Sequence, residues 1–188
     1  DGRIAIAVGD VSGHGLPTGL LVAMAKAGLS TLLESGFQGT ALFVKLNELI
    51  HRSTDSRNYM TLALFAYDPS LLTATLTNAG QLAPYRVRNG SVESLSLPSF
   101  PLGMSPRTDF PTQTFSFLSG DHLVFLTDGI IEATDSTGDP FGFGGLTIPA
   151  VGQKQGVRID GAALSMEVEV AGPADGDEQG RARRPGCG

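Results

Sequence analysis

Hydrophobic residues along this chain fall into two kinds of run, one with helical spacing and one with the alternation of strands. Residues 20–33 are rich in Ala, Leu and Met and are apolar nearly all round, which is typical of a buried helix. Pro17 suits the first turn of that helix, because proline lacks the N–H that would have no partner there. Gly36 is expected to end it, and Thr40 to cap a second helix over 40–51.

Both predicted helices have positions that we assign to a core. In the first helix these are Leu20, Leu21, Val22 and Met24. The second helix is amphipathic, with its apolar side chains one helical turn apart at Leu42, Leu46, Leu49 and Ile50. The two helices are therefore expected to pack together on one layer of the fold.

Outside this helical region the pattern is almost entirely that of strands. Turn signals separate the runs, and Asn89-Gly90 is the clearest of them. Residues 112–118 and 122–127 are expected to pair with each other across 119–121. The short connections predict antiparallel sheets with the two helices on one face. The expected strands are 3–8, 59–67, 72–78, 85–88, 92–95, 112–118 and 122–127.

Composition narrows the class of protein. The 188 residues suit one domain, and a hydrophobic share of 41% with 17% charged residues predicts that most of the chain folds. A net charge of −6 argues against nucleic acid as a partner. Cys187 is the single cysteine, which excludes an internal disulfide. Lys26 interrupts the longest apolar run, 16–33, so no membrane span and a cytoplasmic location are expected.

Two aspartates stand out, because each ends an apolar strand and enters a glycine-containing turn. Asp10 follows the strand 3–8, and Asp128 follows 122–127 and precedes Gly129. Carboxylates held at strand ends suit a hard divalent cation such as Mg²⁺ or Mn²⁺. The alternative is that both aspartates only form turns, since Asp before Gly is common in loops.

Residues 9–15, Gly-Asp-Val-Ser-Gly-His-Gly, resemble the first motif of bacterial metal-dependent serine phosphatases, the SpoIIE/RsbU branch of the PP2C (PPM) family. Further matches follow in the family's order, so that the resemblance covers about residues 1–148. These matches are Asn78-Ala79-Gly80, Pro101-Leu102-Gly103-Met104, the segment 118–129 with Thr127-Asp128-Gly129, Glu132-Ala133, and Phe141-Gly142 to Leu146.

The resemblance implies an α+β fold, a PP2C-like α/β/β/α sandwich of two antiparallel sheets flanked by helices and truncated at the N-terminal strand. Residues 1–148 would be this phosphatase domain, incomplete at its N-terminus. Residues 149–188 are expected to be a degenerate or disordered C-terminal segment, since from residue 172 there is almost nothing to bury. Within that segment, 162–170 has the pattern of one more short helix or strand.

The resemblance also implies a site. In the family, the aspartate at the position of Asp10 bridges two metal ions, the carbonyl of the next residue, here Val11, helps to hold one, and Asp128 binds the second. Asp10 and Asp128 would thus be the catalytic residues, with Mn²⁺ or Mg²⁺ as cofactor. A metal-bound water would attack the phosphorus of a phosphoserine in line.

The loop after Asp10 is expected to face the phosphate through Ser12, Gly13 and His14, with the start of the following helix behind it. His14 is also a candidate proton donor to the leaving serine oxygen. Lysine occurs at this position in the family, which favours the phosphate-facing role. Gln81 replaces the family's histidine after Asn-Ala-Gly, a change expected to be tolerated without a direct role in the site.

Two acidic positions of the family have no match. One lies on a strand that would precede Asp1, and the other belongs to a final Asp-Asp-x-Thr, for which Asp175 and Asp177 lack the following threonine. Since carboxylates carry most of the affinity for a hard cation, we expect weak Mn²⁺ binding and reduced activity. An exposed sheet edge at the missing strand would favour pairing with another chain, so a dimer through that edge is one expectation.

The resemblance therefore implies a metal-dependent protein serine/threonine phosphatase. Its substrate would be phosphoserine on a bacterial signalling regulator of the anti-sigma-factor antagonist type. The alternative is a catalytically impaired pseudophosphatase that acts as a protein-interaction module. A plain nucleotide-binding domain is disfavoured, because residues 9–15 match neither of the glycine-rich phosphate-loop patterns.

Overall fold

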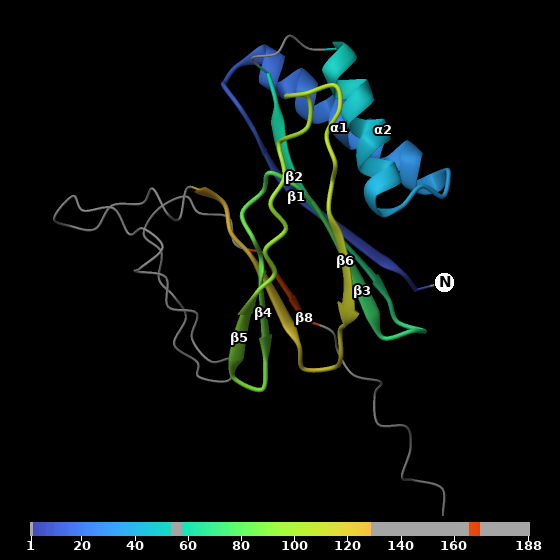
Figure 1. Ribbon diagram of the computed structural model, residues 1–188, viewed down its shortest axis with the longest axis vertical. Helices are drawn as coiled ribbons and strands as arrows, with labels where there is room; N and C mark the ends of the chain where they lie inside the picture. The colour runs from blue at the N-terminus through green and yellow to red at the C-terminus, as the bar shows by residue number, and fades with distance from the viewer. Residues whose placement is uncertain (1, 54–57, 129–165, 170–188) are drawn as a thin grey trace, which may run out of the picture.

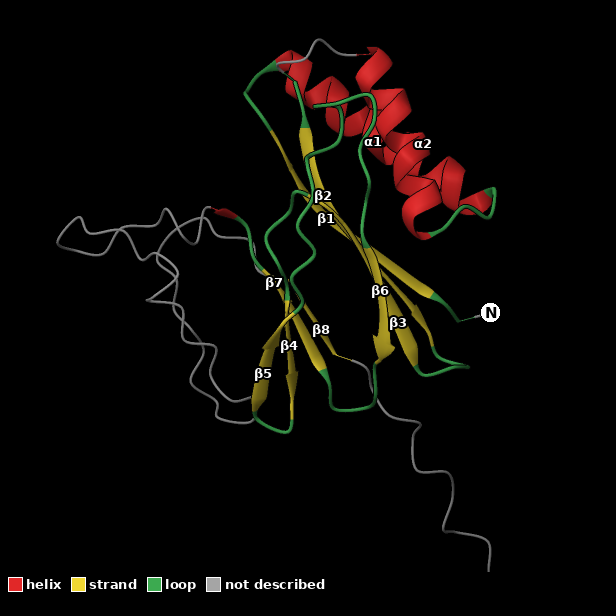
Figure 2. Cartoon of the chain, viewed as in Figure 1, coloured by secondary structure: helices red, strands yellow, loops and turns green. Residues whose placement is uncertain are grey.

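The structure, a computed structural model, describes residues 2–53, 58–128 and 166–169 as two antiparallel sheets with a pair of helices against one of them (Figures 1 and 2). The first sheet has the order β1 (Ile4–Val11), β2 (Met60–Asp68), β3 (Thr73–Ala79) and β6 (Thr112–Ser116). The second has the order β5 (Ser91–Ser94), β4 (Tyr85–Arg88), β7 (His122–Phe125) and β8 (Met166–Glu169). The helices are α1 (Leu16–Glu34) and α2 (Gly39–Ser53).

Strand β2 explains the layering, because its side chains are buried on both faces. Phe65 and Tyr67 point between the two sheets, where they join a core that includes Leu123 and Phe125 of β7. Leu62 and Leu64 point the other way, into the core beneath the helices. A near-continuous apolar strand thus occupies the middle layer, as expected for a strand covered on both sides.

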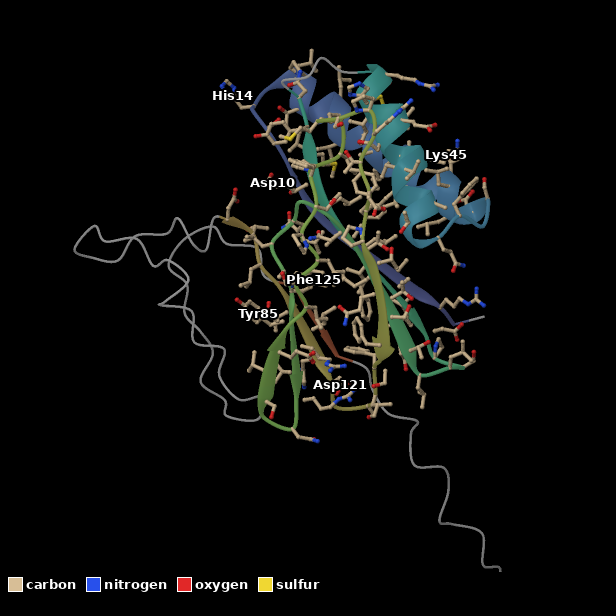
Figure 3. The ribbon with its side chains drawn as sticks, in the orientation of Figure 1. Asp10, His14, Lys45, Tyr85, Asp121 and Phe125 are labelled. Carbon is tan, nitrogen blue, oxygen red and sulfur yellow. The ribbon has the colours of Figure 1, made fainter. Side chains whose placement is uncertain are left out.

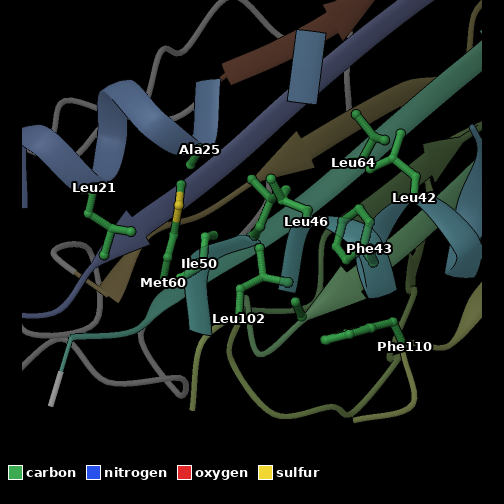
Figure 4. Packing of buried hydrophobic residues seen from close by; sticks show 12 residues of the cluster. Leu21, Ala25, Leu42, Phe43, Leu46, Ile50, Met60, Leu64, Leu102 and Phe110 are labelled. Atoms are coloured by element: carbon green, nitrogen blue, oxygen red, sulfur yellow. The ribbon is translucent and has the colours of Figure 1, made fainter. Parts of the chain in front are cut away.

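The helix layer packs on the first sheet through a second core (Figure 4). Helix α2 contributes fully buried side chains from one face to this core. They are Leu42, Leu46 and Ile50, which are one turn apart, and Phe43 beside them. The sequence had placed Leu49 on the same face, but its side chain is 38% exposed. Gly28 of α1 lets the helices approach closely, since a Cβ there would lie 2.7 Å from Cδ2 of Leu49.

The prediction of a wholly buried first helix is wrong. Leu21 and Ala25 are buried, but Leu20 is 61% and Val22 45% exposed. The physical reason is that α1 packs with one face only, and within the described residues no layer covers its opposite face. With 19 residues and a mean hydropathy of 1.4, α1 is long and apolar enough to cross a membrane. In this structure, however, Leu21 and Ala25 of α1 are part of the core beneath the helices.

The helix ends follow local chemistry. Gly36 has a φ of 84°, and the N–H groups of Gly36 and Phe37 donate to the carbonyls of Leu33 and Leu32. This is the C-terminal motif in which a left-handed glycine closes a helix, and it confirms Gly36 as the stop. Thr40 does not cap α2 as predicted. Its hydroxyl instead donates to the carbonyl of Phe110, 2.8 Å away, and so ties α2 to the loop before β6.

The hairpin predicted at Asn89-Gly90 is confirmed. Both residues have positive φ, 50° and 78°, and they join β4 to β5. These are the backbone angles of the two-residue turn whose twist matches that of paired strands.

The predicted pairing of 112–118 with 122–127 is wrong. Strand β6 pairs with β3 in the first sheet, whereas β7 pairs with β4 and β8 in the second. The intervening turn therefore carries the chain from one sheet to the other. The apolar alternation predicts both strands but cannot say which partner each one takes, because pairing depends on the facing layer.

A charged bridge holds this crossover. The carboxylate of Asp121, 2% exposed, accepts hydrogen bonds from Nε and Nη2 of Arg88 at 2.7 and 2.5 Å. It also accepts one from the backbone N–H of Leu118 at 2.8 Å. Arg88 reaches across to the carbonyl of Ser116 at 2.9 Å, so one guanidinium joins the ends of both sheets.

His122, the first residue of β7, is only 8% exposed, because β7 lies between β4 and β8. Strand β8 confirms regular structure within 162–170. The remainder of 149–188 lies outside the described residues, so its order stays a prediction. Strand β1 lies at an edge of the first sheet, and dimer formation through it also stays a prediction.

Loss of the crossover bridge should destabilise the fold strongly. We expect Arg88→Met to lower the free energy of unfolding by about 3 kcal/mol, since it leaves the Asp121 carboxylate buried without its cation. This is the low end for a buried pair, because the Arg88 side chain is 31% exposed. Urea unfolding at pH 7 measures it. Arg3→Met, which removes the exposed pair with Asp68, should change far less, and equal losses would contradict the assignment.

The same carboxylate should make stability depend on acid. Burial by itself would raise the pKa of Asp121, but hydrogen bonds from Arg88 and Leu118, with the charges of Arg88 and Arg86, lower it below 3.8. A lowered folded-state pKa stabilises the fold above the unfolded value, and that contribution is lost as pH falls through the folded pKa. The gap in unfolding free energy between wild type and Asp121→Asn should therefore narrow below about pH 4. A constant gap from pH 7 to 2 would contradict this.

Candidate active site

Asp10 lies at the end of β1, where this strand pairs with the beginning of β2. Its partner in the register is Thr61, whose Oγ1 accepts the Asp10 N–H at 3.1 Å. The carboxylate is exposed, and its Oδ1 accepts the N–H of Val11 at 2.8 Å. A side chain at Gly9 would clash, since its Cβ would lie 2.3 Å from the Thr61 carbonyl oxygen. Glycine before the aspartate thus lets the two strands meet closely at the site.

The loop after Asp10 is anchored at one residue and open beyond it. Ser12 donates its N–H to the carbonyl of Tyr59, and the N–H of Tyr59 donates back to Oγ of Ser12, both at 3.0 Å. Gly13 and Gly15 have φ of 89° and 87°, so glycine is needed there to turn the chain into α1. His14 between them is exposed, and Figure 3 shows it at the same end of the molecule as Asp10.

Asp128 comes from the other sheet. Two residues, Leu126 and Thr127, separate it from the end of β7, and its side chain is exposed. The other matched positions after it, Glu132 and 141–146, lie outside the described residues. The two aspartates that the sequence singled out thus sit on strand ends of facing sheets.

A polar chain that is buried at Gln81 and half-buried at Thr61 joins the end of β1 to the end of β7. Thr61, already bonded to the backbone of Asp10, donates its hydroxyl to Oε1 of Gln81 at 2.5 Å. Gln81 in turn donates from Nε2 to the carbonyl of Leu126 at 3.1 Å. The sequence singled out neither Thr61 nor Leu126 and gave Gln81 no role. In the sequence, the only feature that pointed to Gln81 was a polar residue directly after the Asn-Ala-Gly motif. Its bond to Leu126 is visible only when the two sheets are packed face to face.

The remaining motif segments belong to the scaffold and carry none of the site's chemistry. Gly80 of the Asn-Ala-Gly segment has a φ of 70°, and a Cβ there would lie 2.9 Å from Pro101. Leu102 exchanges backbone hydrogen bonds with Met60 at 2.8 and 3.0 Å. The amide of Asn47 from α2 accepts the N–H of Gly103 at 2.8 Å. The Pro-Leu-Gly segment is thereby fixed between α2 and the start of β2.

The donors at this end are suited to a hard cation. The carboxylates of Asp10 and Asp128 and the carbonyl of Val11 offer oxygen, which Mg²⁺ and Mn²⁺ prefer. The two carboxylates are exposed, so water can complete a coordination shell. Within the residues described, no group of three or more His, Cys, Asp or Glu side chains gathers at one point. The oxygen donors therefore suit Mg²⁺ or Mn²⁺, but among the described residues they include only two carboxylates, those of Asp10 and Asp128.

Comparison with known proteins identifies the family. A protein-family profile described as Stage II sporulation protein E (SpoIIE) matches residues 1–164. Phosphoserine phosphatase RsbU of Bacillus subtilis (strain 168) is 26% identical over 137 residues, which are 72% of this chain and 41% of RsbU. The chain thus spans less than half the length of this relative.

Solved structures share the fold. The RsbU and RsbW domains of Rv1364c from Mycobacterium tuberculosis match with a TM-score of 0.63 and 24% identity, over 70% of this chain and 38% of that one. The catalytic domain of the serine threonine protein phosphatase PstP, solved in complex with two manganese ions, matches with a TM-score of 0.57 and 14% identity. That match covers 71% of each chain. At these identities the likeness concerns the fold, a PP2C-like α+β sandwich.

The two-sheet fold, the aspartates at facing strand ends and the family profile over residues 1–164 lead to one assignment. This chain belongs to the SpoIIE family, in its branch of PP2C-like domains related to RsbU.

Proposed function

We propose that this chain is the catalytic part of a metal-dependent protein serine/threonine phosphatase that hydrolyses phosphoserine on a regulatory protein. The observation that carries the proposal is the pairing of two strand ends. Asp10 and Asp128 leave facing sheets, and the hydrogen bonds through Thr61 and Gln81 connect the backbone of Asp10 to that of Leu126, two residues before Asp128. Strand ends that carry exposed carboxylates suit phosphoryl hydrolysis assisted by a cation.

Asp10, Asp128 and the carbonyl of Val11 would hold Mn²⁺ or Mg²⁺. When bound, the cation supplies charge neutralisation at the phosphate and lowers the pKa of an attacking water. The manganese in the PstP structure and the family membership support this choice of cofactor.

The loop of Ser12, Gly13 and His14 would position the phosphate. Ser12 is tied to Tyr59, so the loop has a fixed base, while the exposed His14 stands beyond it. The first turn of α1 has no side-chain cap. Backbone N–H groups at the start of a helix attract an anion, so those of this turn, in which Pro17 has none, would favour a phosphate.

The substrate class and setting are part of the same proposal. RsbU is described as a phosphoserine phosphatase, and the solved relative combines RsbU and RsbW domains. We therefore propose a phosphorylated regulator of the anti-sigma-factor antagonist type as substrate, and a cytoplasmic location in which such a partner is met.

The experiment is hydrolysis of a phosphoserine peptide by the whole chain with Mn²⁺ and with EDTA. We expect turnover with Mn²⁺ only, and a loss of about 100-fold or more in Asp10→Asn and Asp128→Asn, since a cation contributes several kcal/mol to such a reaction. Asp109→Asn is the matched control. Asp109 is also exposed, but it lies in the loop before β6 and should leave turnover unchanged.

Wild-type protein that folds but shows no Mn²⁺-dependent turnover would contradict the enzymatic proposal. It would favour the second candidate, a pseudophosphatase that binds its partner without hydrolysis. The carboxylate-poor set of described donors is the observation behind that candidate.

A further inference from the structure

We infer that Gln81 is a positioning residue, which holds the strand end of Asp10 and the strand end of Asp128 at a set spacing across the sandwich. The inference rests on the proposed function, and it assigns a role to a position that carries no charge and touches neither carboxylate. Its basis is the hydrogen-bond chain from Asp10 through Thr61 and Gln81 to Leu126.

The direction of each hydrogen bond in this chain follows from the Leu126 carbonyl, which can only accept. Nε2 of Gln81 is therefore the atom that faces this carbonyl and donates to it at 3.1 Å, and Oε1 faces Thr61. The Thr61 hydroxyl also lies 3.3 Å from the Asp10 carbonyl, but its one hydrogen goes to Oε1 of Gln81, the nearer acceptor at 2.5 Å. The Thr61 oxygen accepts the N–H of Asp10 at 3.1 Å. The amide has one orientation that satisfies both sheets.

Gln81 has little room to move. It is 7% exposed, and the neighbouring Asn78 is 3% exposed. Oδ1 of Asn78 accepts the Gln81 N–H at 3.2 Å, and Nδ2 of Asn78 donates to the Gln81 carbonyl at 2.9 Å. The same Nδ2 donates to the carbonyl of Leu97 at 2.9 Å. The backbone of Gln81 is thus pinned to the first sheet while its side chain spans to the second.

The hydrogen bonds of Gln81 act on the backbone next to the two carboxylates. Asp10 is itself the residue whose N–H ends the chain on one side, and Asp128 follows Leu126 by two residues on the other. Groups outside the ligands that orient them change metal affinity or activity by roughly 10- to 100-fold when removed. An apolar side chain at position 81 would leave the Thr61 hydroxyl and the Leu126 carbonyl without these partners.

A histidine at position 81 is the informative conservative change. Neutral imidazole carries one donor and one acceptor on opposite sides of its ring, so it can accept from Thr61 and donate to Leu126 as the amide does. Methionine has nearly the length of glutamine but neither function. The pair Gln81→His and Gln81→Met therefore separates the hydrogen bonds from the volume of the side chain.

The test measures three quantities on the whole chain. The first, made without metal, is the amide exchange rate of the Asp10 N–H by NMR; the second is Mn²⁺ affinity; the third is kcat and KM on a phosphoserine peptide. For Gln81→Met we expect up to about tenfold faster exchange at Asp10, Mn²⁺ affinity lower by roughly 10- to 100-fold, and lower kcat with KM little changed. Gln81→His should restore all three toward wild type.

Asn47→Leu is the matched control. Asn47 is another buried amide, 2% exposed, which bonds the backbone at Gly103 and Ser105. It should cost stability without changing exchange at Asp10 or Mn²⁺ affinity. Equal effects of Gln81→Met and Asn47→Leu on those two readouts would overturn the inference, because Gln81 would then be merely structural.

Two further outcomes keep the inference separate from the proposed function. If Gln81→Met fails to fold, Thr61→Val removes the same chain from its other side and should give the same faster exchange at Asp10; unchanged exchange there overturns the inference. If wild type shows no Mn²⁺-dependent turnover, the proposed function fails. The metal-free exchange rate still decides whether Gln81 holds the strand end.

Discussion

The face-to-face packing of two sheets is the constraint on which the rest of this structure depends. Phe65 of β2 and Phe125 of β7 meet in one apolar core, and neither sheet could bury that face alone. Packing of this kind is non-directional, so by itself it leaves the sheets free to slide. Two polar bridges at opposite ends of the sandwich fix how the sheets sit on each other. One is Arg88, which pairs with Asp121 and donates to the Ser116 carbonyl of the first sheet, and the other is the neutral chain through Gln81.

One bridge is charged and the other is neutral, and this difference matches what lies at each end of the sandwich. At the end with the crossover turn, a buried carboxylate and a guanidinium form a strong, orientation-dependent contact. At the end with Asp10, an uncharged amide does the joining. A fixed positive charge there would pair with the carboxylates and repel a cation, and a fixed negative charge would repel a phosphate. An amide holds the backbone without altering the local charge. Figure 3 shows Asp121 and Asp10 far apart along the sandwich.

Most of the motif residues by which the family resemblance is seen serve architecture. Gly9 and Gly80 permit close approach of neighbouring backbone or ring atoms, and Gly103 would place a Cβ 2.7 Å from Ile50. Asn47, outside every motif, fixes the Pro-Leu-Gly segment. The chemistry rests on few side chains, which is consistent with a scaffold that brings ligands together from separate strand ends. The exposed apolar side chains of α1, such as Leu16 and Leu20, belong neither to this scaffold nor to the candidate site.

Local physics let the sequence determine the elements: the apolar alternation of β2, the Asn89-Gly90 hairpin, the stop at Gly36 and the two aspartates at strand ends. Each depends on residues adjacent along the chain. Only the tertiary structure decided which strands pair, why β6 and β7 belong to different sheets, and that one face of α1 is exposed. These features, like the role of Gln81, depend on what the opposite layer presents, and residues 45 positions apart such as Gln81 and Leu126 meet only when both sheets are in place.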